Sequence, residues 1–179
     1  SEVEKSEKKL RDEIERLVRE NEKYLERIKE LVEELLRELE KAVRELEKEV
    51  TEIEEVKRQG NVDKRLIEDL IRRIRKKIED LRRKVKKAVT DLKRANDEVR
   101  RKSEEDLRRI EEEIKRLEDR GVEERVLKKL RDLVKEVVDR SKRSLDESTK
   151  VLDTLEKEVR KVLEALKDIL REALERLDK

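Results

Sequence analysis

The stretch KRQGNVDK (residues 57–64) decides the fold, because it contains one of only two glycines among 179 residues. The second glycine lies in EDRGVEER (residues 118–125), and the chain contains no proline. Glycine readily takes the left-handed backbone conformation that ends a helix. Gly60 and Gly121 therefore predict two turns that divide the chain into three segments of nearly equal length.

Each segment carries apolar residues at spacings of three and four, which is the pattern of one helical face. We expect helices at about residues 2–59, 63–119 and 123–178. The face is wider than a two-position coiled-coil seam, so each helix can contact two neighbours. In the first segment the inward positions are Leu10, Ile14, Leu17, Asn21, Tyr24, Ile28, Val32, Leu35, Leu39, Ala42, Leu46, Val50 and Ile53.

Turns as short as these make consecutive helices run antiparallel. The sequence therefore predicts an all-α, single-chain, antiparallel up-down-up three-helix bundle with coiled-coil-like packing. It is expected to be elongated, since a helix of about 55 residues spans roughly 85 Å. We expect one domain over residues 1–179.

Residues suited to helix N-termini lie where the helices are expected to begin. Ser1 with Glu4 forms a capping-box pattern, and Asp63 is a good N-cap for the second helix. Val62 and Ile67 are spaced for a hydrophobic staple across the first turn. Glu123, at the start of the third helix, is a poorer N-cap than Asp63.

Polar residues interrupt the apolar pattern of all three helices. A hairpin about Gly60 and another about Gly121 would bring residues 21–24 level with about 97–100 and about 142–145. The unusual polar residues fall near this one level: Asn21, Tyr24, Asn96, Ser103, Ser141, Ser144 and Ser148.

We interpret these seven residues as a buried hydrogen-bond network that specifies helix register. Displacing a helix would leave polar groups without partners, at about 1–3 kcal/mol each. Two alternatives remain: Tyr24 is only an absorbance label with surface serines around it, or the layer forms a ligand pocket. Thr90 and Thr154 flank their helices at a second shared level and could form a minor pair.

The composition argues against catalysis and metal binding. Histidine and cysteine are absent, and the many glutamates follow exposed positions. Metal sites in helix bundles use histidine beside carboxylates, and a nucleophilic serine needs an adjacent base. We therefore predict that the chain is not an enzyme and has no catalytic, cofactor-binding or metal-binding residues. No apolar run approaches the ~18 residues of a membrane helix, so we expect no membrane partner.

Charge is dense but balanced, with 53 basic and 51 acidic residues. The three segments carry net charges of −5 (residues 1–59), +6 (63–120) and +1 (123–179), which favours contact between the first two helices. Residues 72–87 hold ten basic and two acidic side chains and could bind phosphates without sequence preference. This basic run contains no aromatic residue for base stacking, which argues against nucleic-acid binding.

The chain as a whole resembles computationally designed helical bundles with hydrogen-bond networks. The similarity rests on regular Leu, Ile, Val and Ala seams, a Glu/Lys/Arg surface, minimal glycine turns and the polar layer. It implies a thermostable structural scaffold without natural biochemical function, soluble and produced in the cytoplasm of an expression host. We expect a monomer that requires no partner; the alternative is a component of a designed assembly, which binds a further helix or self-associates.

Overall fold

Three long helices make up the chain in the computed structural model, which describes residues 2–60 and 63–177. They are α1 (Glu2–Arg58), α2 (Lys64–Asp119) and α3 (Glu124–Leu177). Each predicted boundary lies within one residue of the observed one. The predicted all-α class is confirmed, and the described residues contain no strand.

Both turns use the left-handed glycine that the sequence predicts. Gly60 has a φ of 79° and Gly121 a φ of 78°. At the end of α2 the Gly121 amide donates to the Glu118 carbonyl at 3.1 Å, and the Val122 amide donates to the Leu117 carbonyl at 3.2 Å. These two bonds form a Schellman motif, which satisfies carbonyls that the helix itself leaves free.

The helix starts differ in quality, as the sequence predicts. The Asp63 side chain accepts a hydrogen bond from the Arg65 amide at 3.1 Å, so Asp63 is the N-cap of α2. At the start of α3 the Glu123 backbone carbonyl accepts bonds from Val126 and Leu127. The predicted Ser1 capping box and the Val62 staple lie outside the described residues.

The contacts divide the chain into two compact units, and each unit contains part of all three helices. Unit 1 comprises Ser1–Glu30 and Leu92–Val151, and unit 2 comprises Leu31–Asp91 and Leu152–Lys179. The turn at Gly121 belongs to unit 1 and the turn at Gly60 to unit 2. That residues 1–179 fold as one domain stays a prediction.

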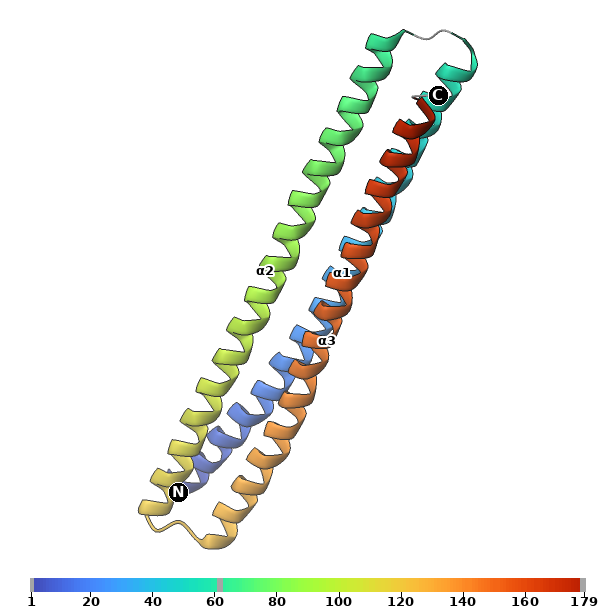
Figure 1. The fold of residues 1–179 in the computed structure, drawn as a ribbon. Coiled ribbons are helices and arrows are strands. Elements are labelled where there is room, and N and C mark those ends of the chain that lie inside the picture. The colour runs from blue at the N-terminus through green and yellow to red at the C-terminus, as the bar shows by residue number, and fades with distance from the viewer. Residues whose placement is uncertain (1, 61–62, 178–179) are drawn as a thin grey trace. The chain divides into compact units, whose positions relative to one another are not determined.

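In unit 1, side-chain pairs between helices fix the chain directions. Between α1 and α3 the partners rise together, from Glu22–Arg140 to Lys29–Glu147, so these helices run parallel. Between α2 and α3 they run in opposite senses, and the yellow end of α2 turns into the orange start of α3 (Figure 1). The core of this unit includes Leu10, Ile14, Leu17, Val18, Ile110, Ile114, Leu117, Leu127, Leu130, Val134 and Val137.

Unit 2 has the same kind of interior. Between α1 and α2 the ion pairs Glu38–Lys84 and Glu49–Lys77 run in opposite senses, as expected for antiparallel helices. The buried residues are aliphatic and come from all three helices: Val32, Leu39, Leu46, Val50, Ile53, Ile67, Ile74, Ile78, Val85, Val89, Leu152, Leu155, Val159, Leu163, Leu166 and Ala173. The three-helix bundle that the sequence predicts is therefore the fold of the chain.

The inward face of α2 differs in detail from the predicted one. Val89 and Asn96 are buried, whereas Ala88 and Ala95 are only half-buried. From the spacing of its apolar residues, which include Leu81, Val85, Ala88, Leu92, Ala95 and Val99, the sequence predicts the two alanines inward and Asn96 on the flank. Because a helix advances by 3.6 residues per turn, neighbouring positions compete for the interior, and the larger side chains occupy it here.

Candidate functional site

Asn96 is the centre of a hydrogen-bonded group in unit 1. Its Oδ1 accepts a bond from the Tyr24 hydroxyl at 3.3 Å and another from the Ser148 hydroxyl at 2.6 Å. Its Nδ2 donates to the Thr149 hydroxyl oxygen at 3.0 Å. Tyr24 lies on α1 and the other two partners on α3, so one amide of α2 joins all three helices.

Arg100 extends this group to the surface. Its guanidinium donates to the Thr149 hydroxyl oxygen at 3.1 Å and to Asp146 Oδ1 at 3.4 Å. The Thr149 hydroxyl donates to the backbone carbonyl of Leu145 at 3.0 Å, and the Ser148 hydroxyl shares its single proton between Asn96 Oδ1 and that same carbonyl, which lies 2.8 Å away. We call Tyr24, Asn96, Arg100, Ser148 and Thr149 the asparagine network.

A second buried polar contact of unit 1 joins α1 to α2. Asn21 Nδ2 donates to the Ser103 hydroxyl oxygen at 3.1 Å, and both residues are buried. Ser141 of α3 is buried as well, with 3% of its surface exposed. We call the buried polar residues of unit 1 outside the asparagine network, which are Asn21, Ser103 and Ser141, the serine cluster.

Not every polar residue singled out by the sequence is bonded. The Ser141 hydroxyl is buried and makes no hydrogen bond with the described residues. Ser144 is half-buried, and no described residue bonds to its side chain. The structure thus brings Tyr24, Asn96 and Ser148 together, and Asn21 with Ser103, but gives Ser141 and Ser144 no side-chain partner among the described residues.

The sequence interpretation missed Thr149 and Arg100. Thr149 directly follows Ser148 and lies one helical turn after Leu145, so its spacing placed it beside the inward face. Arg100 lies one turn after Asn96, where a long side chain can reach back to the same partners. The sequence contains both spacings. A residue on the flank of an apolar stripe, however, has a spacing that is equally compatible with a surface position.

The environment of Tyr24 disfavours its ionised form. Burial raises the pKa of the Tyr24 phenol from 10.0 to about 12, and the nearby Asp97 carboxylate adds to the shift. The neutral hydroxyl is therefore retained across the neutral and moderately alkaline range. In that form it can donate to Asn96 Oδ1, whereas a phenolate could not.

The chain shares its fold with a protein described as a computationally designed three-helix bundle. A solved structure of such a protein matches with a TM-score of 0.52, covering 97% of this chain and 83% of that one. At 19% sequence identity the similarity shows the fold alone. No protein-family model matches the chain, and neither does any curated protein.

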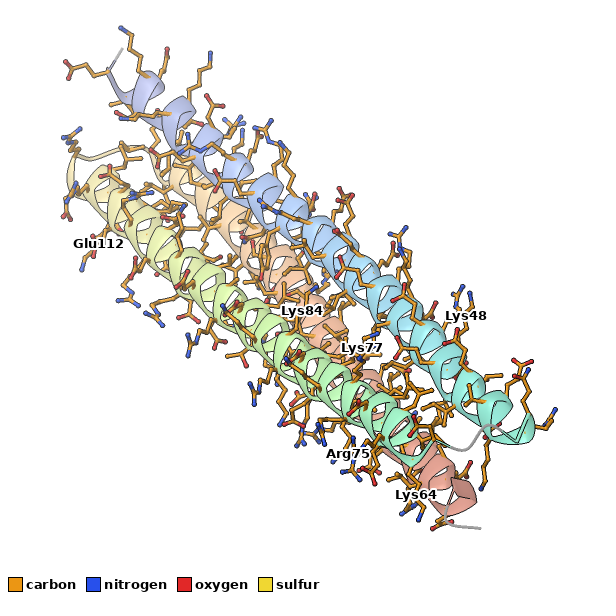
Figure 2. The ribbon with its side chains drawn as sticks, turned by 90° about the horizontal axis from the view of Figure 1, so that it is seen from above. Lys48, Lys64, Arg75, Lys77, Lys84 and Glu112 are labelled. Carbon is orange, nitrogen blue, oxygen red and sulfur yellow. The ribbon has the colours of Figure 1, made fainter. Side chains whose placement is uncertain are left out.

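The basic run at residues 72–87 lies on α2 in unit 2. Lys77 pairs with Glu49 of α1, and Lys84 lies 4.0 Å from Glu38. Figure 2 shows these two lysines on the side of α2 next to α1, whereas Arg75 points away from it. Part of the basic charge is thus directed at acidic residues of the same chain.

The predicted pair of Thr90 and Thr154 is wrong. Both side chains are exposed, and the Thr90 hydroxyl donates to the Lys86 carbonyl of its own helix at 2.9 Å. A threonine in a helix commonly satisfies its hydroxyl in this way. The pair is therefore no second polar layer.

The described ranges contain neither a metal-binding cluster nor a helix suited to a bilayer. No group of three or more His, Cys, Asp or Glu side chains there is arranged to hold a metal ion. Within the same ranges, none of the helices combines the length and apolarity that crossing a bilayer requires. A groove of 540 Å³ in unit 1, between α2 and α3, contains no member of the asparagine network or the serine cluster. Its lining residues are Glu111, Ile114, Lys115, Glu118, Arg131, Val134, Lys135 and Val138.

Proposed function

We propose that the chain is a designed structural scaffold in which the asparagine network specifies how the helices align. The observation that carries this proposal is the bonding of Asn96 to both other helices within unit 1. Elsewhere, apart from the serine cluster, the buried side chains of the described residues are aliphatic. Aliphatic side chains interchange with little cost, so they favour burial without favouring one alignment.

A single buried polar group can favour one alignment of the helices over the others. A slip of one helical turn moves a side chain by about 5.4 Å, well beyond hydrogen-bond reach. Each buried group left without a partner then costs about 1–3 kcal/mol. The gain in stability from the network itself is small by comparison, because the unfolded chain makes equivalent bonds with water.

Spin labels test the alignment directly, because the chain has no native cysteine. We would introduce Lys23→Cys on α1 and Lys142→Cys on α3, both exposed positions of unit 1. The parent should give one narrow distance distribution. The triple variant Tyr24→Leu, Asn96→Leu and Ser148→Ala should retain its helicity but give a broadened distribution or a second distance.

The control for this experiment is Arg101→Ala, a substitution at an exposed position of α2, the helix that carries Asn96. It should leave the distance distribution as in the parent. If the triple variant also gives the single parental distance, the network does not determine the alignment, and the proposed role is wrong.

The remaining parts of the proposal concern assembly and activity. We propose a thermostable monomer without catalytic activity, cofactor or natural partner, folded as one domain. Sedimentation equilibrium should give 21.7 kDa; twice that mass would favour the self-associating alternative. Calorimetry should show one unfolding transition with equal calorimetric and van't Hoff enthalpies, as for a single cooperative domain. Salt-sensitive retention on heparin would instead favour polyanion binding by residues 72–87.

A further inference from the structure

The Ser141 hydroxyl is the one buried side-chain polar atom of the described residues that lacks a hydrogen-bond partner. The residue is 97% shielded from solvent, given its 3% exposure. A serine within a helix can donate to the carbonyl four residues earlier, as Thr90 and Thr149 of this chain do. Ser141 makes no such bond with Val137. A buried hydroxyl without a partner costs about 1–3 kcal/mol.

The position of Ser141 repeats that of a residue that is bonded. Ser141 lies one heptad before Ser148 on α3, and Ser103 lies one heptad after Asn96 on α2. Because these helices run antiparallel, Ser103 and Ser141 form the heptad counterpart of the Asn96–Ser148 pair. In that pair the Ser148 hydroxyl donates to Asn96 Oδ1 at 2.6 Å. Ser103 occupies the position equivalent to Asn96, and its side chain is too short to reach Ser141 as Asn96 reaches Ser148.

The serine cluster also holds further unused hydrogen-bonding capacity. The Ser103 oxygen accepts from Asn21 Nδ2, and no described residue accepts its hydroxyl proton. Asn21 Oδ1 likewise accepts no bond from a described side chain. The cluster therefore presents two hydroxyl donors, on Ser103 and Ser141, and one amide acceptor, on Asn21.

We propose that the serine cluster binds one buried water molecule. The water accepts hydrogen bonds from the Ser103 and Ser141 hydroxyls and donates one to Asn21 Oδ1. Three bonds are typical of a buried water, and polar sites of this kind bind it with long residence. The water accepts the Ser141 hydroxyl proton, as Asn96 Oδ1 accepts the Ser148 proton in the asparagine network.

Crystallography and NMR of the intact chain test this proposal. A crystal structure that resolves ordered solvent should show one water within 3.5 Å of the three side chains. In solution, the methyl groups of Val137, one turn from Ser141 on the same face, should show a nuclear Overhauser contact with a long-lived water. Methyl protons do not exchange with solvent, so this signal reports proximity.

Two variants should remove the water for different reasons. Ser103→Asn supplies an amide at the position equivalent to Asn96, so that Ser141 bonds to it directly and the water is displaced. The double variant Ser103→Ala and Ser141→Ala removes both hydroxyl donors and leaves one partner, too few to hold a water. Both should lose the water contact of Val137 while circular dichroism shows unchanged helicity.

Ser144→Ala is the matched control, because Ser144 lies on the same helix as Ser141 and its side chain bonds to none of the described residues. It should leave the water contact intact. The proposal is overturned if the parent crystal shows no water at the cluster, or if Ser141 bonds to the Val137 carbonyl or to Ser103 itself. Neither outcome bears on helix alignment by the asparagine network, which is tested at Tyr24, Asn96 and Ser148.

Discussion

The Tyr24 hydroxyl of α1 and the Ser148 hydroxyl of α3 donate to the same oxygen, Asn96 Oδ1, at 3.3 and 2.6 Å. One amide of α2 is thus the common acceptor for two residues, one on each neighbouring helix, that lie more than a hundred positions apart in sequence. Because the shared group is buried, any change to Asn96 affects the contacts of both neighbours. This relationship makes Asn96 the most sensitive polar position of unit 1.

We predict that Asn96→Ala lowers the free energy of unfolding by about 2 kcal/mol. The substitution strands the Tyr24 hydroxyl, removes one bond each from Ser148 and Thr149, and leaves a cavity. Guanidinium denaturation followed by circular dichroism measures the change. Arg101→Ala, exposed on the same helix, should stay within about 0.5 kcal/mol of the parent.

The triple variant Tyr24→Leu, Asn96→Leu and Ser148→Ala should recover most of the stability lost in Asn96→Ala. Replacing all partners of a buried polar group with apolar side chains removes the unsatisfied groups along with the bonds. The same denaturation measurement applies. A triple variant less stable than Asn96→Ala would mean that the network contributes stability itself rather than alignment.

We predict that Tyr24 ionises with a midpoint of about 12 in the folded protein. Burial is the larger cause and the Asp97 carboxylate the smaller one. The absorbance of the phenolate reports this residue alone, because the chain contains one tyrosine and no tryptophan or phenylalanine. In denaturant the midpoint should return to about 10.

The raised pKa of Tyr24 also sets the sign of its pH effect. Below pH 10 the phenol is neutral in both the folded and the unfolded chain, so its contribution to stability is fully present. That contribution is lost as the pH rises from 10 to about 12. Asp97→Asn should lower the folded midpoint but leave it above 10. A parental midpoint of 10 would contradict the burial of the phenol.

We predict that Gly121→Ala destabilises the chain by about 1 kcal/mol. The φ of 78° places residue 121 in the left-handed region, which costs energy for a residue with a Cβ atom. A Cβ atom there would meet nothing within 4 Å, so the backbone conformation is the whole cause. Gly121→Asn should cost less, because asparagine tolerates this conformation. Equal losses in chemical denaturation would show that the turn changes shape instead.

The two inner N-caps should respond in opposite directions. Asp63→Ala removes the bond to the Arg65 amide and should cost about 1 kcal/mol. Glu123→Ser should stabilise the chain by several tenths of a kcal/mol, because serine caps a helix better than glutamate. Urea denaturation of both variants measures the difference. A loss of stability in Glu123→Ser would mean that the Glu123 side chain makes a contact that outweighs the cap.

The sequence by itself determined the helices and their ends. Gly60 and Gly121 are the only two glycines, the residue type that takes positive φ most readily, and no proline interrupts the segments between them. The spacing of the apolar residues then assigned most of the interior correctly. These properties are local, because each depends on residues within one or two helical turns.

Only the tertiary structure decided which polar residues meet. Asn96 rather than Ala95 occupies the inward face, and Thr149 is a hydrogen-bond partner of Asn96. The reason is that side chains of three helices compete for one limited volume. Ser141 and Ser148 both lie on the apolar stripe of α3, yet only Ser148 bonds to a side chain of α2, the longer Asn96. Hydrogen bonds depend on differences of about 0.5 Å, and a periodic pattern locates a residue only to within a helical turn.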